Sequence, residues 1–176
     1  MSSRSKLASR GVPAAFVPLL FAAATASGLP AALSAWDQAA LKRARDGAAQ
    51  RLRGTECLKL LSDFTDSKGG SLQANLDTLE MSAADYIQTI DFRDGSGNQS
   101  CRQKTVQLTT FRHLPVVYVC PAGLSVLGSR FAQIQIHNPA LAEYMLIHEM
   151  LHTLGLGENP PSSLEITSRV ISRCRN

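Results

Sequence analysis

The sequence predicts a single α+β domain in which a small mixed sheet packs on N-terminal helices and a buried helix, with a short C-terminal helix. Three observations support this fold class. Residues 36–64 are rich in good helix formers, residues 116–120 form a β-branched run, and residues 140–154 are apolar on nearly every side. Because no internal repeat or low-complexity linker divides the chain, we expect one domain over residues 36–176.

The first half of this domain is predicted to be mainly helical. Residues 36–64 predict a helix that is broken near Gly54, followed by a loop at residues 65–71. Two shorter helices are expected at residues 72–81 and 83–90, and Ser82 begins the second with an acidic residue three positions later.

The strands are expected in the middle of the chain. Residues 104–111 alternate well enough for a half-buried strand, and residues 116–120 are typical of an inner strand. Residues 131–136 also alternate, with Ala132, Ile134 and Ile136 on one side, which predicts an edge strand or part of a loop. Residues 163–173 predict the closing helix.

The N-terminus has the pattern of a secretory signal peptide. Positive charges at Arg4, Lys6 and Arg10 precede an uncharged, mostly apolar stretch, and Ala26 ends a suitable cleavage site. We therefore expect residues 1–26 to be removed, with a second possible site near Ala35, and the product to be secreted or periplasmic. An uncleaved membrane anchor is the alternative, although prolines in the stretch weaken it as one continuous helix.

Charge and cysteine content narrow the classes of partner and compartment. Removal of residues 1–26 lowers the net charge from +4 to +1, so no concentrated basic face remains to indicate a nucleic-acid partner. An even number of cysteines in an exported chain predicts two disulfides. Three pairings are possible, of which we favour Cys101–Cys120 with Cys57–Cys174.

The strongest functional signal is a histidine pair in the apolar segment. Asn138 and Pro139 are typical of a helix start, and His148 and His152 stand four residues apart, on one face of the expected helix. Two imidazoles in this geometry can bind one Zn²⁺, and Glu149 can reach a water that the metal activates. Gly155 permits a reversal of the chain.

The spacing resembles the metzincin signature H-E-x-x-H-x-x-G-x-x-H or -D, and residues 154–163 resemble small exported bacterial metallopeptidases. The resemblance implies a zincin-like domain with an edge strand across its active-site cleft. Two departures are the glutamate at the third-ligand position and the absence of any methionine after Met150, so the methionine turn is missing. The implied roles are zinc ligation by His148, His152 and Glu158, general base catalysis by Glu149, and a turn at Gly155.

These residues predict an exported zinc-dependent peptidase that hydrolyses a peptide or protein substrate with an activated water. Glu165 is the competing third ligand, since a folded-back C-terminal segment would bring it within reach. An exported metal-binding or interaction module without turnover is the main alternative, because the sequence identifies no residue that would stabilise the oxyanion. A zinc hydrolase of non-peptide substrates is a third.

Overall fold

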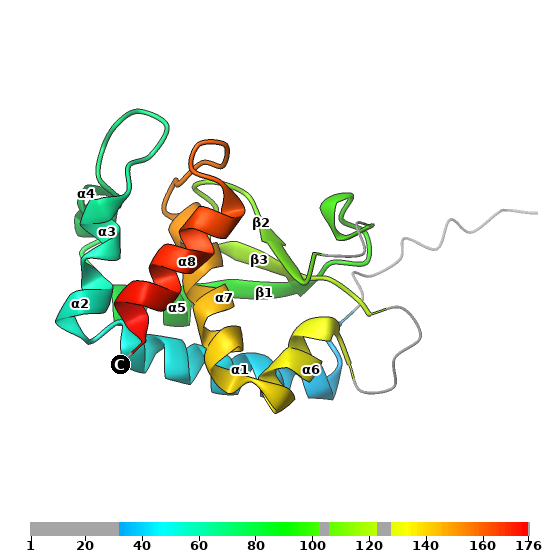
Figure 1. The fold of residues 1–176 in the computed structure, drawn as a ribbon. Helices are drawn as coiled ribbons and strands as arrows, with labels where there is room; N and C mark the ends of the chain where they lie inside the picture. The colour runs from blue at the N-terminus through cyan, green and yellow to red at the C-terminus, as the bar shows by residue number, and fades with distance from the viewer. Residues whose placement is uncertain (1–31, 103–105, 123–127, 176) are drawn as a thin grey trace, which may run out of the picture.

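The computed structural model describes residues 32–102, 106–122 and 128–175 (Figure 1). The predicted signal peptide, residues 1–26, lies outside the described residues. Within the part of the chain that is described, no helix has both the length and the apolar character needed to cross a membrane. The predicted fold class is confirmed in its coarse form, since the chain combines helices with one small mixed sheet.

The N-terminal helices match the predicted break near Gly54. Helix α1 (Ala35–Arg51) begins at Ser34, whose hydroxyl accepts a hydrogen bond from the Asp37 amide, and it buries a stripe of alanines and Leu41. Two single-turn helices follow, α2 (Thr55–Leu58) and α3 (Leu60–Asp63). Helices α4 (Leu72–Thr78) and α5 (Ala83–Thr89) are capped by Ser71 and Ser82. Both helices were predicted, at residues 72–81 and 83–90, and both end earlier in the structure.

The sheet has three short strands in the order β1-β3-β2. Strand β1 (Asp91–Asp94) runs parallel to β3 (Val116–Val119), and β2 (Leu108–Thr110) runs antiparallel to β3. A short 3-10 helix, η1 (Ser100–Arg102), lies between β1 and β2. The strand predicted at residues 116–120 is β3, and the strand predicted at residues 104–111 is shorter in the structure, where it is β2; residues 104 and 105 lie outside the described residues. Strand β1 was not predicted, because three of its four residues are charged and it has no apolar run.

The prediction for residues 131–136 is wrong, because this segment is helical. Helix α6 (Arg130–His137) begins at Ser129, whose hydroxyl accepts a hydrogen bond from the Ala132 amide. The buried side chains are Phe131, Ala132 and Gln135, which follow helical spacing, whereas Ile136 is exposed. Contacts with α1 and α7 decide the structure here, and they override the alternation of apolar residues.

Helix α7 (Pro139–Thr153) is the buried helix that the apolar segment predicted. The Asn138 side chain caps it by accepting a hydrogen bond from the Leu141 amide. It contacts α1, α6, α8 and β2. In Figure 1 it runs beside α8 (Ser163–Cys174), the predicted C-terminal helix. Its residues are therefore packed on several sides.

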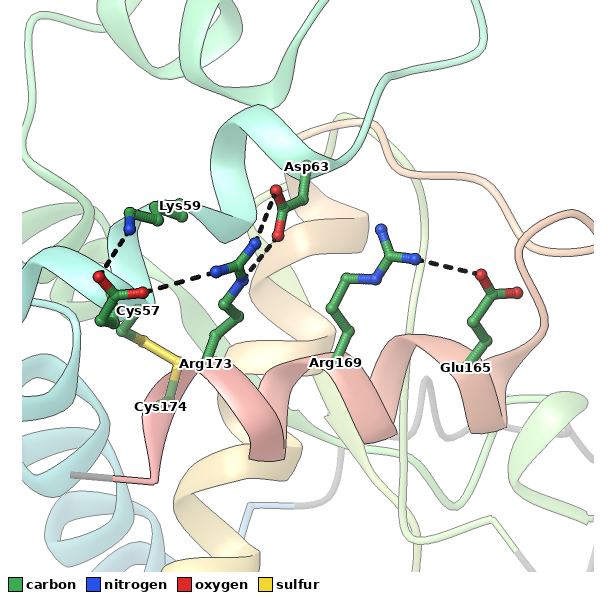
Figure 2. Close-up of polar contacts among 8 residues, drawn as sticks. Cys57, Lys59, Asp63, Glu165, Arg169, Arg173 and Cys174 are labelled. Carbon is green, nitrogen blue, oxygen red and sulfur yellow. Dashed lines mark hydrogen bonds and ion pairs between the residues drawn. A yellow bond between two sulfur atoms is a disulfide. The ribbon is translucent and has the colours of Figure 1, made fainter.

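Helix α8 is fastened at its C-terminal end to the N-terminal helices (Figure 2). A disulfide joins Cys57 to Cys174, and the Arg173 guanidinium donates to the Asp63 carboxylate at 2.9 Å. A second disulfide joins Cys101 to Cys120, so the favoured pairing is confirmed. Two disulfides indicate an oxidising environment, extracellular or periplasmic.

Candidate metal centre

The two histidines of α7 form the centre of the site. His148 and His152 lie one turn apart on the same face of the helix, and both are buried, at 6% and 8% exposure. Their Nε2 atoms are 3.0 Å apart. The four-residue separation on a helix places both rings on one face, within reach of each other.

The Nδ1 atom of each imidazole is held by a hydrogen-bond partner. His152 Nδ1 lies 2.9 Å from the Leu156 carbonyl oxygen, and His148 Nδ1 lies 2.9 Å from Thr167 Oγ1. A carbonyl oxygen only accepts, so His152 carries its hydrogen on Nδ1 and leaves a lone pair on Nε2. Partners of this kind fix the ring orientation and tautomer of metal-binding histidines.

Glu158 is brought to the histidines by the turn that follows α7. Gly155 has φ +112°, a conformation that side-chain-bearing residues rarely adopt, and it reverses the chain as the sequence predicted. The Glu158 Oε1 atom lies 3.4 Å from His152 Nε2 and 3.8 Å from His148 Nε2. One potential ligand atom from each residue lies within 4.8 Å of the others, so the three could hold a metal ion.

Glu165, the competing third ligand, lies elsewhere. It is exposed on the first turn of α8, where its carboxylate accepts from the Arg169 guanidinium at 3.4 Å. It lines a second, smaller pocket and not the cleft that contains the histidines. The geometry therefore favours Glu158.

Residues from distant parts of the chain hold the turn in place. The Asn75 side chain donates to the Leu154 carbonyl oxygen at 2.9 Å and to the Asp66 carboxylate at 3.0 Å. Asp66 also forms an isolated antiparallel bridge with Leu156. The His113 ring lies so close to Gly155 that an added Cβ would clash with its Cε1 atom. These contacts were not predicted, because Asp66, Asn75 and His113 lie far from the histidine motif in the chain.

Burial shifts the proton affinities of the site in the metal-free protein. Burial of its carboxyl, and then the nearby Glu158 carboxylate, raises the pKa of Glu149 to about 8. Burial, and then the neighbouring His152, lowers the pKa of His148 to about 3. His148 is therefore neutral over the physiological range, which is the form that binds a metal.

The site opens into a cleft of about 940 Å³. His148, Glu149, His152 and Glu158 line one side of the cleft, and strand β2 lines another. Among the described residues, strand β2 pairs only with β3, so it lies at an edge of the sheet. Residues 131–136, which were predicted as an edge strand or part of a loop, instead form helix α6.

Comparison of the chain with protein-family models, with curated proteins and with solved structures gives no match. The fold and the site define a mixed α and β protein, stabilised by two disulfides, with a candidate metal centre in an open cleft. Two imidazole nitrogens and one carboxylate oxygen are a donor set suited to a divalent transition metal.

Proposed function

We propose that the protein is an exported zinc-dependent peptidase. The observation that carries this proposal is the convergence of the His148 and His152 Nε2 atoms with the Glu158 carboxylate, while the outer nitrogens are hydrogen-bonded. In the tautomer in which His148 Nδ1 donates to the Thr167 hydroxyl, both buried Nε2 atoms carry lone pairs beside the Glu158 carboxylate, and leaving these acceptors without a partner is costly. A metal ion satisfies all three groups together.

Zinc is the metal that we propose, on the chemistry of the donors. Two imidazoles and one carboxylate are a known ligand set of catalytic zinc, and three protein ligands leave a position open for chemistry. Structural zinc sites normally have four protein ligands instead. The exposed fraction of the Glu158 side chain, 43%, also places this site at the wall of the cleft and not in a closed core.

Glu149 is the general base in this proposal. Zinc, when bound, polarises a carbonyl group and lowers the pKa of a water to about 7. Glu149 adjoins His148 and lines the same cleft, so its carboxylate accepts the proton of the attacking water and then delivers it to the leaving amine. Strand β2 lines the cleft, and no other strand of the described residues pairs with its outer edge, which suits an extended peptide.

Substitution of Glu149 separates an enzyme from a metal-binding module. Glu149→Gln keeps the shape of the side chain and removes the base, so it should retain zinc and lose most turnover, about 10²-fold or more. Glu80→Gln is a matched control, since this exposed glutamate lines neither the cleft nor the second pocket. The measurements are zinc content and digestion of a broad peptide library.

The metal ligands give the second half of this test. His148→Ala and His152→Ala should each lose the zinc that the parent protein holds at one per chain. If the wild-type protein cannot be loaded with zinc, the proposed metal site is contradicted, and the proposed peptidase function with it. Zinc retention without cleavage by the parent would favour the module.

A further inference from the structure

A second pocket adjoins the candidate metal centre. It has a volume of about 440 Å³ and lies between the loop after α3, the turn after α7 and helix α8. The cleft and this pocket share three lining residues, Arg112, Leu156 and Glu158. A ligand that lies across the metal centre therefore meets the long cleft on one side and the smaller pocket on the other.

Most charged side chains of this pocket already have partners. The Asp63 carboxylate accepts from Arg173 at 2.9 Å, and Glu165 accepts from Arg169 at 3.4 Å, as Figure 2 shows. The Arg169 guanidinium also lies over the Phe64 ring, 5.0 Å from its centroid. Asp66 accepts hydrogen bonds from the Asn75 side chain and from two backbone amides of its own loop.

Arg112 is the exception. Among the described residues, its guanidinium has neither a hydrogen bond nor an ion pair. It lies beside the turn that carries Glu158, since a Cβ on Gly157 would be 3.4 Å from its Nη1 atom. The next residue, His113, packs on Gly155 of the same turn, so this loop is fixed against the metal centre.

We propose that Arg112 binds a carboxylate of the peptide substrate in the smaller pocket, and so selects peptides with an anionic group next to the cleaved bond. This inference rests on the proposed peptidase function. A guanidinium presents a planar set of donors that matches a carboxylate with two parallel hydrogen bonds. The carboxylate has two possible sources, the C-terminus of the peptide or an Asp or Glu side chain.

Binding to an inactive protein tests the inference. Zinc-loaded Glu149→Gln protein is incubated with two peptide libraries of the same sequences, one with free C-terminal carboxylates and one amidated. Bound peptides are identified by mass spectrometry. We expect about tenfold tighter binding of the carboxylate that Arg112 recognises. Asp or Glu compared with Asn or Gln within the amidated peptides distinguishes a side chain from the C-terminus.

Variants of the two arginines complete the design. Arg112→Ala in the Glu149→Gln background should abolish the preference, and Arg112→Lys should keep only part of it, because it retains the charge without the planar donors. Arg169→Gln is the matched control in the same pocket and should keep the preference. Equal loss in Arg169→Gln would mean that general positive potential is responsible, and it would overturn the inference.

The outcomes also separate this inference from the proposed function. If neither the free acids nor the acidic side chains bind better than their neutral counterparts, or if no peptide binds, Arg112 does not have this role. Turnover by the wild-type protein is measured beside the binding. Cleavage without a preference for anionic peptides contradicts the role of Arg112 alone. A preference that depends on Arg112, without any cleavage, contradicts the peptidase function alone.

Discussion

The two histidines of the candidate metal centre are oriented by different parts of the chain. His152 Nδ1 donates to the Leu156 carbonyl oxygen, four residues away in the turn that ends the same helix. His148 Nδ1 is held by Thr167, nineteen residues away on helix α8. The His152 half of the site is therefore formed by local structure, whereas the His148 half depends on the packing of α8 against α7.

This difference shows where the site depends on the whole fold. Helix α8 is fastened by the Cys57–Cys174 disulfide and by the Arg173–Asp63 ion pair, which join residues 117 and 110 positions apart. The Arg51 guanidinium also donates to the Cys174 carbonyl oxygen at 2.6 Å. The N-terminal helices thus support the orientation of His148 through α8, although none of their residues lines the cleft.

The largest expected effect comes from removing the disulfide at the end of α8. Cys57→Ser with Cys174→Ser should lower the free energy of unfolding by about 4–5 kcal/mol, because this disulfide constrains a very long loop of the unfolded chain. The Cys101–Cys120 disulfide closes a loop with a sequence separation of only 19 residues. Its removal by Cys101→Ser with Cys120→Ser should therefore lower the free energy of unfolding by about 3 kcal/mol. Denaturant unfolding of the four-cysteine parent and both variants measures the difference.

The same pair of variants tests the comparison between the two halves of the site. Because α8 carries Thr167, the Cys57/Cys174 variant should also bind zinc more weakly than the Cys101/Cys120 variant, under conditions where both are folded. Equal zinc affinity in the two variants would show that α8 keeps His148 oriented without its disulfide.

A smaller effect is expected from the hydroxyl that holds His148. Thr167→Val keeps the shape of the side chain but removes the partner of Nδ1, so zinc affinity should fall about 10–100-fold. Thr167→Ser retains a hydroxyl and should bind zinc nearly as well as the parent. Competition with a chelator of known affinity measures both. If Thr167→Val binds zinc as tightly as the parent, the packing around the His148 imidazole is sufficient to orient the ring.

The sequence predicted the features that depend on local spacing. Asn138 and Pro139 indicated the start of α7, the histidine motif indicated the shared face, and Gly155 indicated the reversal that brings Glu158 back. Each of these follows from helix geometry or from backbone conformation within about ten residues. The structure has the same arrangement.

The features that the sequence did not predict depend on contacts between distant segments. Residues 131–136 alternate like a strand, yet burial against α1 and α7 makes them helical. No sequence motif marks Thr167, Asn75 or Arg112, because their roles depend only on the residues that the fold places beside them. Strand β1 was not predicted either, because three of its four residues are charged and they show no strand pattern.

The smallest expected effect is the pH dependence of stability in the metal-free protein. The pKa of His148, lowered to about 3, makes stability rise between about pH 3 and 6.5, because only the unfolded chain binds that proton in this range. The pKa of Glu149, raised to about 8, makes stability fall between about pH 4.5 and 8, because only the folded chain retains that proton. The two slopes oppose each other between about pH 4.5 and 6.5.

Stability of the metal-free protein should therefore be greatest near pH 4.5–6.5 and fall by about 1–2 kcal/mol between pH 6.5 and 8. Glu149→Gln has no proton to lose and should abolish this fall, whereas Glu165→Gln, on the exposed face of α8, should retain it. Chemical denaturation in the presence of a chelator, repeated across this pH range, gives the three curves. Parallel curves for the parent and Glu149→Gln would show that the Glu149 carboxyl is solvated in the folded protein, and that its proton affinity is set by water and not by the cleft.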